Sequence, residues 1–470
     1  MKYFGVAIVF ILLSFSSNAQ IAYQRVSNKN FSIGSYGRAG VDWSATESGS
    51  IGRRLNLNGM GSIGGRMEEQ DYMEIAPAFH FQPAGDDDPT KINVQMRISA
   101  FSRDLTHVAY TSTGASTGLT IVMPELYAEA ENIGGSGWTV WVGARLYRGG
   151  DIHIADHFYF NDHSGQGFGA EYKNMRFGGL FIASSDTTTT YPPYFYINIA
   201  TGTPSAELRQ RMKGFFEYDF HLNENNTLTA LAEFHYMSKG QDSEELLPEE
   251  YDFPSDWGYV IGGRLKSNIN WFDGVTNEFA ARLGKGIANG GDGGLSSTHL
   301  TFGAPNLDEL NFQKAYSVSI VNSAFIQHNE NNSTSAYLIY TNSKGAGATN
   351  GLEESYFGDL VYNKKEDFTL GMRNSRCFGK YFKLLTDIHY SQRKDGDNPW
   401  ANVTKMSFAP TLTPTGDKSF WARPEIRFVA SFAYYNQYAS DELYSPYLQV
   451  VGDRRFGNYF GIKMEWWVWN

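Results

Sequence analysis

The sequence has only one cysteine, Cys377, among its 470 residues. A single cysteine cannot form an intramolecular disulfide, so a disulfide-linked scaffold is excluded. After its N-terminal segment the chain also lacks any stretch of the ~20 apolar residues that a transmembrane helix needs, and its mean hydropathy is −0.39. Basic residues are outnumbered by acidic ones, 39 to 50, and the formal charge of −11 argues against nucleic acid as a partner.

The N-terminus has the three parts of a secretory signal peptide. Lys2 supplies positive charge, residues 4–15 form an apolar stretch, and residues 17–19, Ser-Asn-Ala, fit a small-x-small cleavage site. We therefore expect a signal peptide over residues 1–19 and a mature protein over residues 20–470. An exported protein without membrane helices is either soluble or a β-barrel.

Alternation of apolar and polar residues near the C-terminus predicts β-strands. From residue 425 to 434 and from 459 to 468, polar or small side chains alternate with apolar ones, which places them on opposite faces of a strand. A soluble β-sandwich gives the same alternation. However, Trp466, Trp467 and Trp469 are typical of the aromatic girdle of a transmembrane β-barrel. The 33 Phe, 29 Tyr and 49 Gly suit such girdles and tight turns.

The length of the chain fits one large barrel. A transmembrane strand with its turn and outer loop uses roughly 20–28 residues, which predicts about 16–22 strands and a water-filled lumen. No Pro- or Ser-rich linker, break in composition or repeat of roughly 20–50 residues divides the sequence. We therefore expect an all-β fold in which residues 20–470 form a single transmembrane β-barrel domain.

Three motifs, in the expected order, resemble those of a known family. Residues 36–40, Tyr-Gly-Arg-Ala-Gly, belong to a first strand, and residues 419–424 with residues 464–467 lie near the end. Between them, a strand ends in an Arg-x-Tyr pair and runs into a loop with an Asp-x-His-x-x-Asp core and a glycine cluster. These residues are Arg145, Tyr147, Asp151, His153, Asp156, Gly165, Gly167 and Gly169. Together the motifs resemble the maltoporin (sugar porin) family.

The resemblance implies an 18-stranded antiparallel transmembrane β-barrel whose third loop folds inward and narrows the pore. It also implies a homotrimer in the bacterial outer membrane that lets maltodextrin-like oligosaccharides diffuse passively. In that family, sugars slide along aromatic faces while charged groups exchange hydrogen bonds with the hydroxyls.

The structure of a pyranose explains these residue types. Its C–H face packs on an indole or phenol ring, and its hydroxyls need donors and acceptors in place of water. Arginine offers five donors, whereas carboxylates only accept. Conduction also requires several modest, adjacent sites, so that the ligand can both enter and leave.

The resemblance implies an aromatic line and a polar track along the pore. It assigns the aromatic line to Tyr36, Tyr72, Trp421 and Trp467. The constriction and polar track comprise Phe158, Arg38, Arg66, Glu74, Tyr127, Arg148, Asp151 and Asp156. Strand parity independently places Trp467 on the face of Glu465, and Tyr36 on the face of Arg38, so we expect both to point into the lumen.

Four positions depart from the family pattern. The constriction tyrosine is Phe158, which lacks a hydroxyl donor, and Tyr127 stands near an expected arginine. An expected phenylalanine falls on Val275 or Thr276, and no aromatic residue lies around Leu119, where a neighbouring subunit would lend one. A general or ion-selective porin without strong sugar specificity therefore remains the alternative.

A third function, a barrel enzyme such as a lipase or protease, would require a nucleophile–base pair. The sequence has no GxSxG elbow and no HExxH helix, and the surroundings of Cys377 do not suggest a reactive thiol. The core of residues 151–156 resembles a set of metal ligands, but the family places it in the constriction loop. We expect no enzyme activity, no metal ion and no cofactor. The expected partners are an oligosaccharide, outer-membrane lipid and two further copies of the chain.

Overall fold

The computed structural model of the chain describes residues 26–28, 30–43, 55–82, 88–102, 119–183, 196–197, 204–205, 210–239, 254–269, 274–289, 301–355 and 359–468. The predicted signal peptide, residues 1–19, lies outside the described residues.

Most of the regular structure is β. The wall strands are β2 (Phe31–Trp43), β3 (Tyr72–Phe81), β4 (Lys91–Ser102), β5 (Leu119–Glu131), β6 (Trp138–Arg145), β9 (Gly165–Tyr172), β10 (Met175–Ala183), β13 (Gln210–Asn223), β14 (Asn226–Met237), β15 (Asp256–Ile269), β16 (Val275–Gly286), β17 (Tyr316–Asn329), β18 (Asn332–Lys344), β21 (Lys364–Cys377), β22 (Phe382–Asp395), β23 (Ala401–Leu412), β24 (Glu425–Tyr435) and β25 (Phe456–Val468). The other elements are β1 (Val26–Asn28), β7 (Arg148–Ile152), β8 (His157–Asp162), β11 (Tyr196–Ile197), β12 (Pro204–Ser205), β19 (Leu352–Glu354), β20 (Leu360–Tyr362), α2 (Gln437–Asp441), α3 (Pro446–Val451) and the 3-10 turns η1 (Ile133–Gly135) and η2 (His153–Ala155). Within the described residues, no helix is long and apolar enough to cross a membrane.

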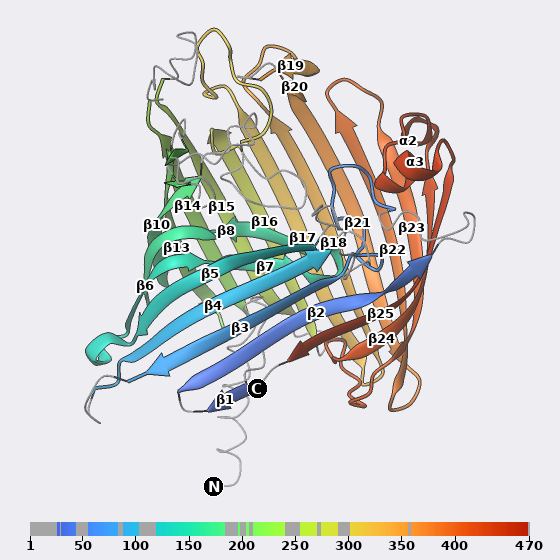
Figure 1. The fold of residues 1–470 in the computed structure, drawn as a ribbon, viewed down its shortest axis with the longest axis horizontal. Coiled ribbons are helices and arrows are strands. Elements are labelled where there is room, and N and C mark those ends of the chain that lie inside the picture. Colours follow the sequence, from blue (N-terminus) through green and yellow to red (C-terminus); the bar gives the residue numbers. More distant parts are fainter. Residues whose placement is uncertain are drawn as a thin grey trace.

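The wall strands close into a barrel (Figure 1). Among the described residues, 19 strands share one sheet, and all of them except the short β1 form the 18-stranded antiparallel wall. Closure occurs where the first wall strand meets the last: in the pairing of β2 with β25, Tyr36 lies opposite Trp467 and Arg38 opposite Glu465. A closed sheet has no unpaired edge. The predicted 18-stranded antiparallel barrel is confirmed.

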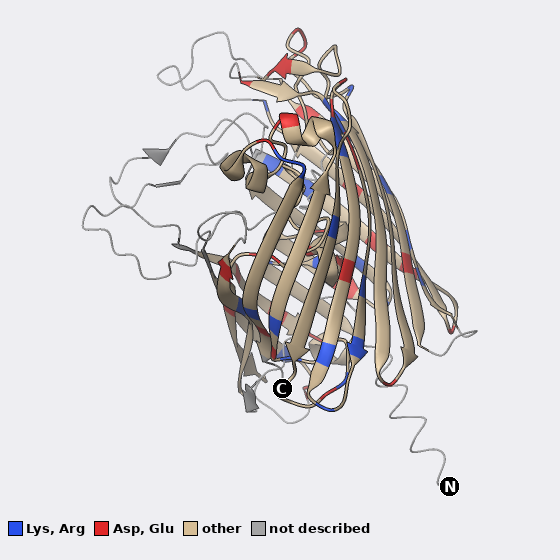
Figure 2. Ribbon diagram, turned by 90° about the vertical axis from the view of Figure 1, so that its right-hand side faces the viewer, with Lys and Arg blue, Asp and Glu red and all other residues tan. Residues whose placement is uncertain are grey.

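The two faces of the wall have opposite polarity. In β24, Glu425 is fully buried, whereas Phe428 on the other face is 50% exposed. In β25, Glu465 is buried and Met464 is exposed. Figure 2 shows acidic and basic residues interspersed along the wall strands. Charged faces therefore line the lumen and apolar faces point to the membrane, as the alternation along residues 425–434 and 459–468 predicted.

Connections at the two ends of the barrel differ in length. At one end, residues 173–174 join β9 to β10, and residues 330–331 join β17 to β18. At the other end, two long connections fold into the lumen. We call residues 55–71, between β2 and β3, the first loop, and residues 146–164, between β6 and β9, the third loop. The Tyr159 hydroxyl of the third loop donates to Glu278 Oε2 on β16 at 2.8 Å, so the predicted inward-folded third loop is confirmed.

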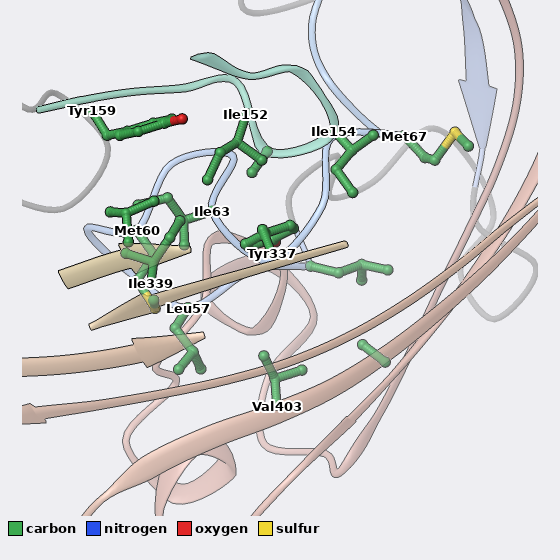
Figure 3. Close-up of a cluster of buried hydrophobic side chains, with 14 of the residues drawn as sticks. Leu57, Met60, Ile63, Met67, Ile152, Ile154, Tyr159, Tyr337, Ile339 and Val403 are labelled. Atoms are coloured by element: carbon green, nitrogen blue, oxygen red, sulfur yellow. The ribbon is translucent and has the colours of Figure 1, made fainter. Parts of the chain in front are cut away.

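An apolar core lies inside the barrel, between the two inward loops and one part of the wall. Figure 3 shows its side chains pointing toward one another from these three sources. The first loop supplies Leu57, Met60, Ile63 and Met67, the third loop supplies Ile152, Ile154 and Tyr159, and strands β18 and β23 supply Tyr337, Ile339 and Val403. Burial of each large apolar side chain contributes about 1.5–3 kcal/mol, so both loops are fixed against the wall.

Phe428→Arg tests the outward face. An arginine in the middle of the lipid-facing wall should lower the free energy of unfolding by about 2–4 kcal/mol, because the charge must be taken out of water. Tyr434→Arg is the matched control: it lies on the same face of β24 but near the end of the strand, where the cost falls to about 0–1 kcal/mol. Urea titration in phospholipid vesicles measures both. Equal losses would contradict the assignment of the outward face.

Candidate functional site

A continuous series of aromatic rings runs along the inside of the wall. The ring centroids of Tyr72 and Tyr36 are 5.8 Å apart, and those of Tyr36 and Trp467 are 6.5 Å apart. The imidazole of His153 follows at 5.6 Å from Trp467 and 5.5 Å from Trp421. The structure therefore brings together all four residues of the predicted aromatic line, with His153 inserted among them.

Strand register explains how Tyr72, Tyr36 and Trp467 come together. Tyr36 lies directly opposite Trp467 across the β2–β25 pair, and Tyr72 lies opposite Arg38 across the β2–β3 pair. Directly paired residues point to the same face of a sheet and lie close enough for their side chains to touch. The guanidinium of Arg38 also lies over the Tyr72 ring, 5.2 Å from its centroid.

Trp421 reaches the series from a different element. It belongs to residues 413–424, which connect β23 to β24 at the end of the barrel that otherwise has short turns. Arg423 of this connection stacks on Trp467, 4.2 Å from the ring centroid, and donates from Nε to Glu465 Oε2 at 2.7 Å. Arg423 thus fixes the indole of Trp467 and holds the 413–424 segment against β25.

The hydroxyl of Tyr36 lies among charged groups. It donates to Glu465 Oε1 at 2.9 Å and accepts from Arg66 Nη2 at 2.6 Å. Arg38 Nη1 lies 3.1 Å from the same oxygen. Only 3% of Tyr36 is exposed. The predicted polar residues Arg38 and Arg66 therefore both contact the hydroxyl of Tyr36.

The tip of the third loop contacts the same arginine. Arg66 Nη1 donates to the backbone oxygen of His153 at 3.0 Å and lies 3.9 Å from Asp156 Oδ1. Arg423 Nη2 lies 3.2 Å from His153 Nε2. Burial and the adjacent Arg66 hold the pKa of His153 well below its usual value. The ring is therefore neutral and lies between two guanidinium groups.

The sequence motif predicted that His153 lies in the constriction loop, but it did not predict that His153 belongs to the aromatic line. Its place in the aromatic series depends on the inward fold of the third loop, for which its sequence spacing gives no signal.

The remaining constriction residues divide into two places. In the third loop, the guanidinium of Arg148 lies 4.4 Å from the centroid of the Phe158 ring, and Phe158 pairs with Asp151 across the β7–β8 hairpin. Tyr127 lies on the wall: Arg145 stacks on its ring at 4.9 Å, in a group with Trp141, Phe215 and Tyr147 of the third loop.

The predicted track residue Glu74 is fixed by two neighbours on the wall. It is buried and pairs with Arg97 Nη1 at 2.7 Å. It also accepts a hydrogen bond from the Tyr72 hydroxyl. This carboxylate therefore holds the first residue of the aromatic series in place.

Phe325 extends the series beyond Trp421, toward the end of the barrel that has the short turns. Its ring centroid is 6.0 Å from that of Trp421. Phe325 lies on β17 directly opposite Thr276 on β16, one of the two positions where a phenylalanine had been expected. The neighbouring strand therefore supplies the missing ring. Sequence analysis could not find it, because the connection of residues 287–315 between the two strands leaves their register undetermined.

One lysine of the wall anchors the first loop. Lys405 on β23 donates from Nζ to Asn56 Oδ1 at 2.7 Å and to the Gly65 backbone oxygen at 2.9 Å, and it forms an ion pair with Glu68. All three partners belong to the first loop, and Lys405 is 1% exposed. Because Arg66 lies between Gly65 and Glu68, this anchor also positions its contact with the Tyr36 hydroxyl.

Lys405→Met should release the first loop. Removing one partner of a buried ion pair leaves the other charge uncompensated at a cost of about 3–5 kcal/mol, which here falls on the docked loop rather than on the wall. We expect a larger single-channel conductance with little change in the urea midpoint of the barrel. Lys314→Met, which removes a lysine with a 64% exposed side chain, is the control and should leave conductance unchanged. Unchanged conductance in Lys405→Met would show that the first loop does not narrow the pore.

Asp151 predicts a dependence of ion selectivity on pH. It lies in β7 of the third loop rather than in the wall, and burial together with the nearby Asp156 raises its pKa to about 8. It is therefore protonated below this pH and gains a negative charge above it. The permeability ratio of cations to anions should rise between pH 7 and pH 9, as measured by reversal potential in a salt gradient. Asp151→Asn should abolish the part of the rise that this group causes, and an identical rise in the variant would exclude Asp151 as its origin.

A family model described as LamB porin matches residues 31–467 of the chain. The fold is also similar to solved structures. OmpF of Salmonella typhi in complex with daunomycin is 13% identical, with 94% of this chain and 100% of that chain covered and a TM-score of 0.38. The outer membrane channel DcaP of Acinetobacter baumannii is 10% identical, with 95% and 99% covered and a TM-score of 0.37.

The family match spans nearly the whole chain, and the protein therefore belongs to the LamB porin family. It is a porin of the bacterial outer membrane.

Proposed function

We propose that this member of the LamB porin family is a sugar porin, through which maltodextrin-like oligosaccharides diffuse passively. The observation that carries the proposal is the continuous aromatic series, in which no ring centroid is more than 6.5 Å from the next. Arginines and carboxylates flank it on both sides, as the hydrogen-bonding needs of sugar hydroxyls require.

Aromatic and charged residues have different roles in the proposed transport. Aromatic faces accept the C–H face of each sugar ring, and short spacing lets the ring pass from one face to the next. Two charged side chains of the third loop remain partly accessible: 32% of Arg148 and 34% of Asp156. One donates and the other accepts hydrogen bonds, so sugar hydroxyls can exchange partners as they pass. Each contact is modest, which permits release as well as entry.

A general or ion-selective porin is the second candidate. The observation that favours it is the burial of Tyr36 in the middle of the aromatic series, where Arg66 contacts its hydroxyl. Phe158 also lacks the hydroxyl of the family's constriction residue. If Tyr36 stays buried during transport, the aromatic series is interrupted and the lumen distinguishes solutes by size and charge.

We also propose a homotrimer, on the basis of the family resemblance. The outward face of the wall carries exposed apolar side chains. Ile121 on β5 and Val142 on β6 are 65% and 62% exposed. Such side chains suit contact with lipid or with a neighbouring subunit. Chemical crosslinking in native outer membranes, followed by electrophoresis without heating, tests the oligomeric state.

Ion conductance in a planar bilayer, titrated with linear α-glucans, tests the sugar proposal. Saturable closure of the current would support a sugar-binding pore. A large conductance that no oligosaccharide blocks would favour the general porin.

Trp467→Ala should raise the Kd for the blocking sugar by about tenfold, equivalent to about 1.4 kcal/mol, because the substitution removes a central ring of the series. Trp43→Ala is the control: this tryptophan is 44% exposed and lies on the opposite face from Arg38 in β2. Its loss should leave sugar affinity unchanged. Wild-type affinity in Trp467→Ala would remove this ring from the path.

A further inference from the structure

Four lysines lie on the outward face of the wall, near the ends of their strands. Lys285 is near the end of β16, Lys344 ends β18, Lys364 begins β21 and Lys394 is near the end of β22. Each shares its face with apolar residues of the same strand, as Lys364 does with Leu370, which is 52% exposed. These four residues, which we call the rim lysines, therefore point toward the membrane rather than into the lumen.

The rim lysines lie at the end of the barrel that has the long connections. The connection from β18 to β21, which contains β19 and β20, extends beyond the wall at this end (Figure 1). In outer-membrane barrels the short turns face the periplasm and the long loops face the cell exterior. The rim lysines are therefore placed at the head groups of the outer leaflet.

Strand pairing brings three of the rim lysines into one row. Lys285 lies directly opposite Tyr316 of β17, Tyr316 lies opposite Lys344, and Lys344 lies opposite Lys364. The ammonium of Lys285 is 5.7 Å from the centroid of the Tyr316 ring. Like charges on directly opposite residues of a sheet repel each other. The pair of Lys344 and Lys364 is therefore unfavourable unless an anion lies against both.

The neighbouring side chains supply little negative charge. On the outward faces of β16, β17, β18, β21 and β22, all of which are described, Glu366 is the one acidic residue. It lies opposite Lys394, and its Oε1 accepts a hydrogen bond from the Tyr340 hydroxyl at 2.9 Å. Within the described part of the chain, no ion pair involves a rim lysine. Four positive charges thus accompany one negative charge.

Apolar side chains follow the rim lysines toward the middle of the wall. Leu370 and Met372 on β21 are 52% and 41% exposed, and Ile388, directly opposite Met372 on β22, is 37% exposed. The outward face of these strands is therefore basic at the rim and apolar further along. A lipid with an anionic head group and acyl chains has the complementary arrangement.

This face is distant from β5 and β6, whose outward residues could contact a neighbouring subunit. In the closed ring of wall strands, β18 lies opposite β5. The rim lysines therefore remain accessible to lipid in the proposed homotrimer.

We propose that the rim lysines bind the phosphate groups of an outer-leaflet glycolipid, whose acyl chains lie on the apolar face of β21 and β22. Each lysine offers three donors and a full positive charge to phosphate oxygens. A phosphate that contacts both Lys344 and Lys364 replaces their repulsion with two attractions. The site is separate from the pore and does not depend on what the pore transports.

Binding of bisphosphorylated lipid A to the purified porin tests the site. Native mass spectrometry in lauryldimethylamine oxide micelles gives the Kd. Lys344→Gln combined with Lys364→Gln should raise the Kd about 25-fold, about fivefold for each lysine removed near an anionic head group. The matched control combines Lys173→Gln with Lys380→Gln, which removes two lysines that also lie over tyrosine rings but belong to the short turns. This control should keep the wild-type Kd.

Two further comparisons separate charge from folding and lipid from phosphate. Lys344→Arg combined with Lys364→Arg keeps both charges and should keep the wild-type Kd within about threefold. Equal Kd values for wild type and the Gln double variant, or an equal loss of affinity toward dephosphorylated lipid A, would overturn the site. Displacement of lipid A by millimolar inorganic phosphate would also overturn it, because the row would then bind phosphate without regard to the lipid.

The repulsion between Lys344 and Lys364 gives a second readout. In vesicles of phosphatidylcholine, which has no net charge, Lys364→Gln should raise the urea midpoint of the barrel, because the repulsion is removed. Adding lipid A should then raise the midpoint of the wild type more than that of Lys364→Gln. An equal rise in both proteins would contradict phosphate binding between these two lysines.

Discussion

Every backbone N–H and C=O group that crosses the apolar layer of a membrane needs a hydrogen-bond partner within the protein, because the hydrocarbon offers none. The rest of this structure depends on how β2 and β25 meet that need. Their pairing closes the sheet, and the same register brings Tyr36 opposite Trp467 and Arg38 opposite Glu465. The constraint that closes the barrel therefore also assembles the centre of the candidate path. A shift of one residue would turn these side chains toward the membrane.

Closure of the wall also decides where charges can be buried. The lumen holds many buried ionic side chains, and their pairs connect elements that are distant in sequence. Arg423 with Glu465 links the 413–424 segment to β25, Arg66 with Asp156 links the two inward loops, and Lys405 with Glu68 links the first loop to β23. A buried ion pair adds little net stability, but breaking one leaves a charge without compensation. These pairs thus determine loop position more than overall stability.

The wall was predictable from the sequence, and the loops were less so. Alternation with a period of two is a local property, so the faces of β24 and β25 and the inward direction of Tyr36 and Trp467 followed from residue order alone. Trp421, Arg66 and the third loop required the family resemblance. His153, Phe325 and Lys405 were missed, because their contacts depend on loop paths and on register across long connections. Tyr127, which the resemblance assigns to the polar track, packs with Arg145 in an aromatic group that includes Tyr147 of the third loop.

The apolar core inside the barrel influences what the pore admits, but the architecture of the wall does not depend on it. The hydrogen bonds of the wall do not depend on Met60 or Ile63, which pack only within the lumen. Length and composition of the first loop can therefore vary during evolution without disturbing the 18-stranded frame. Natural selection, or an engineer, can replace the first loop and so obtain pores of different width from the same barrel.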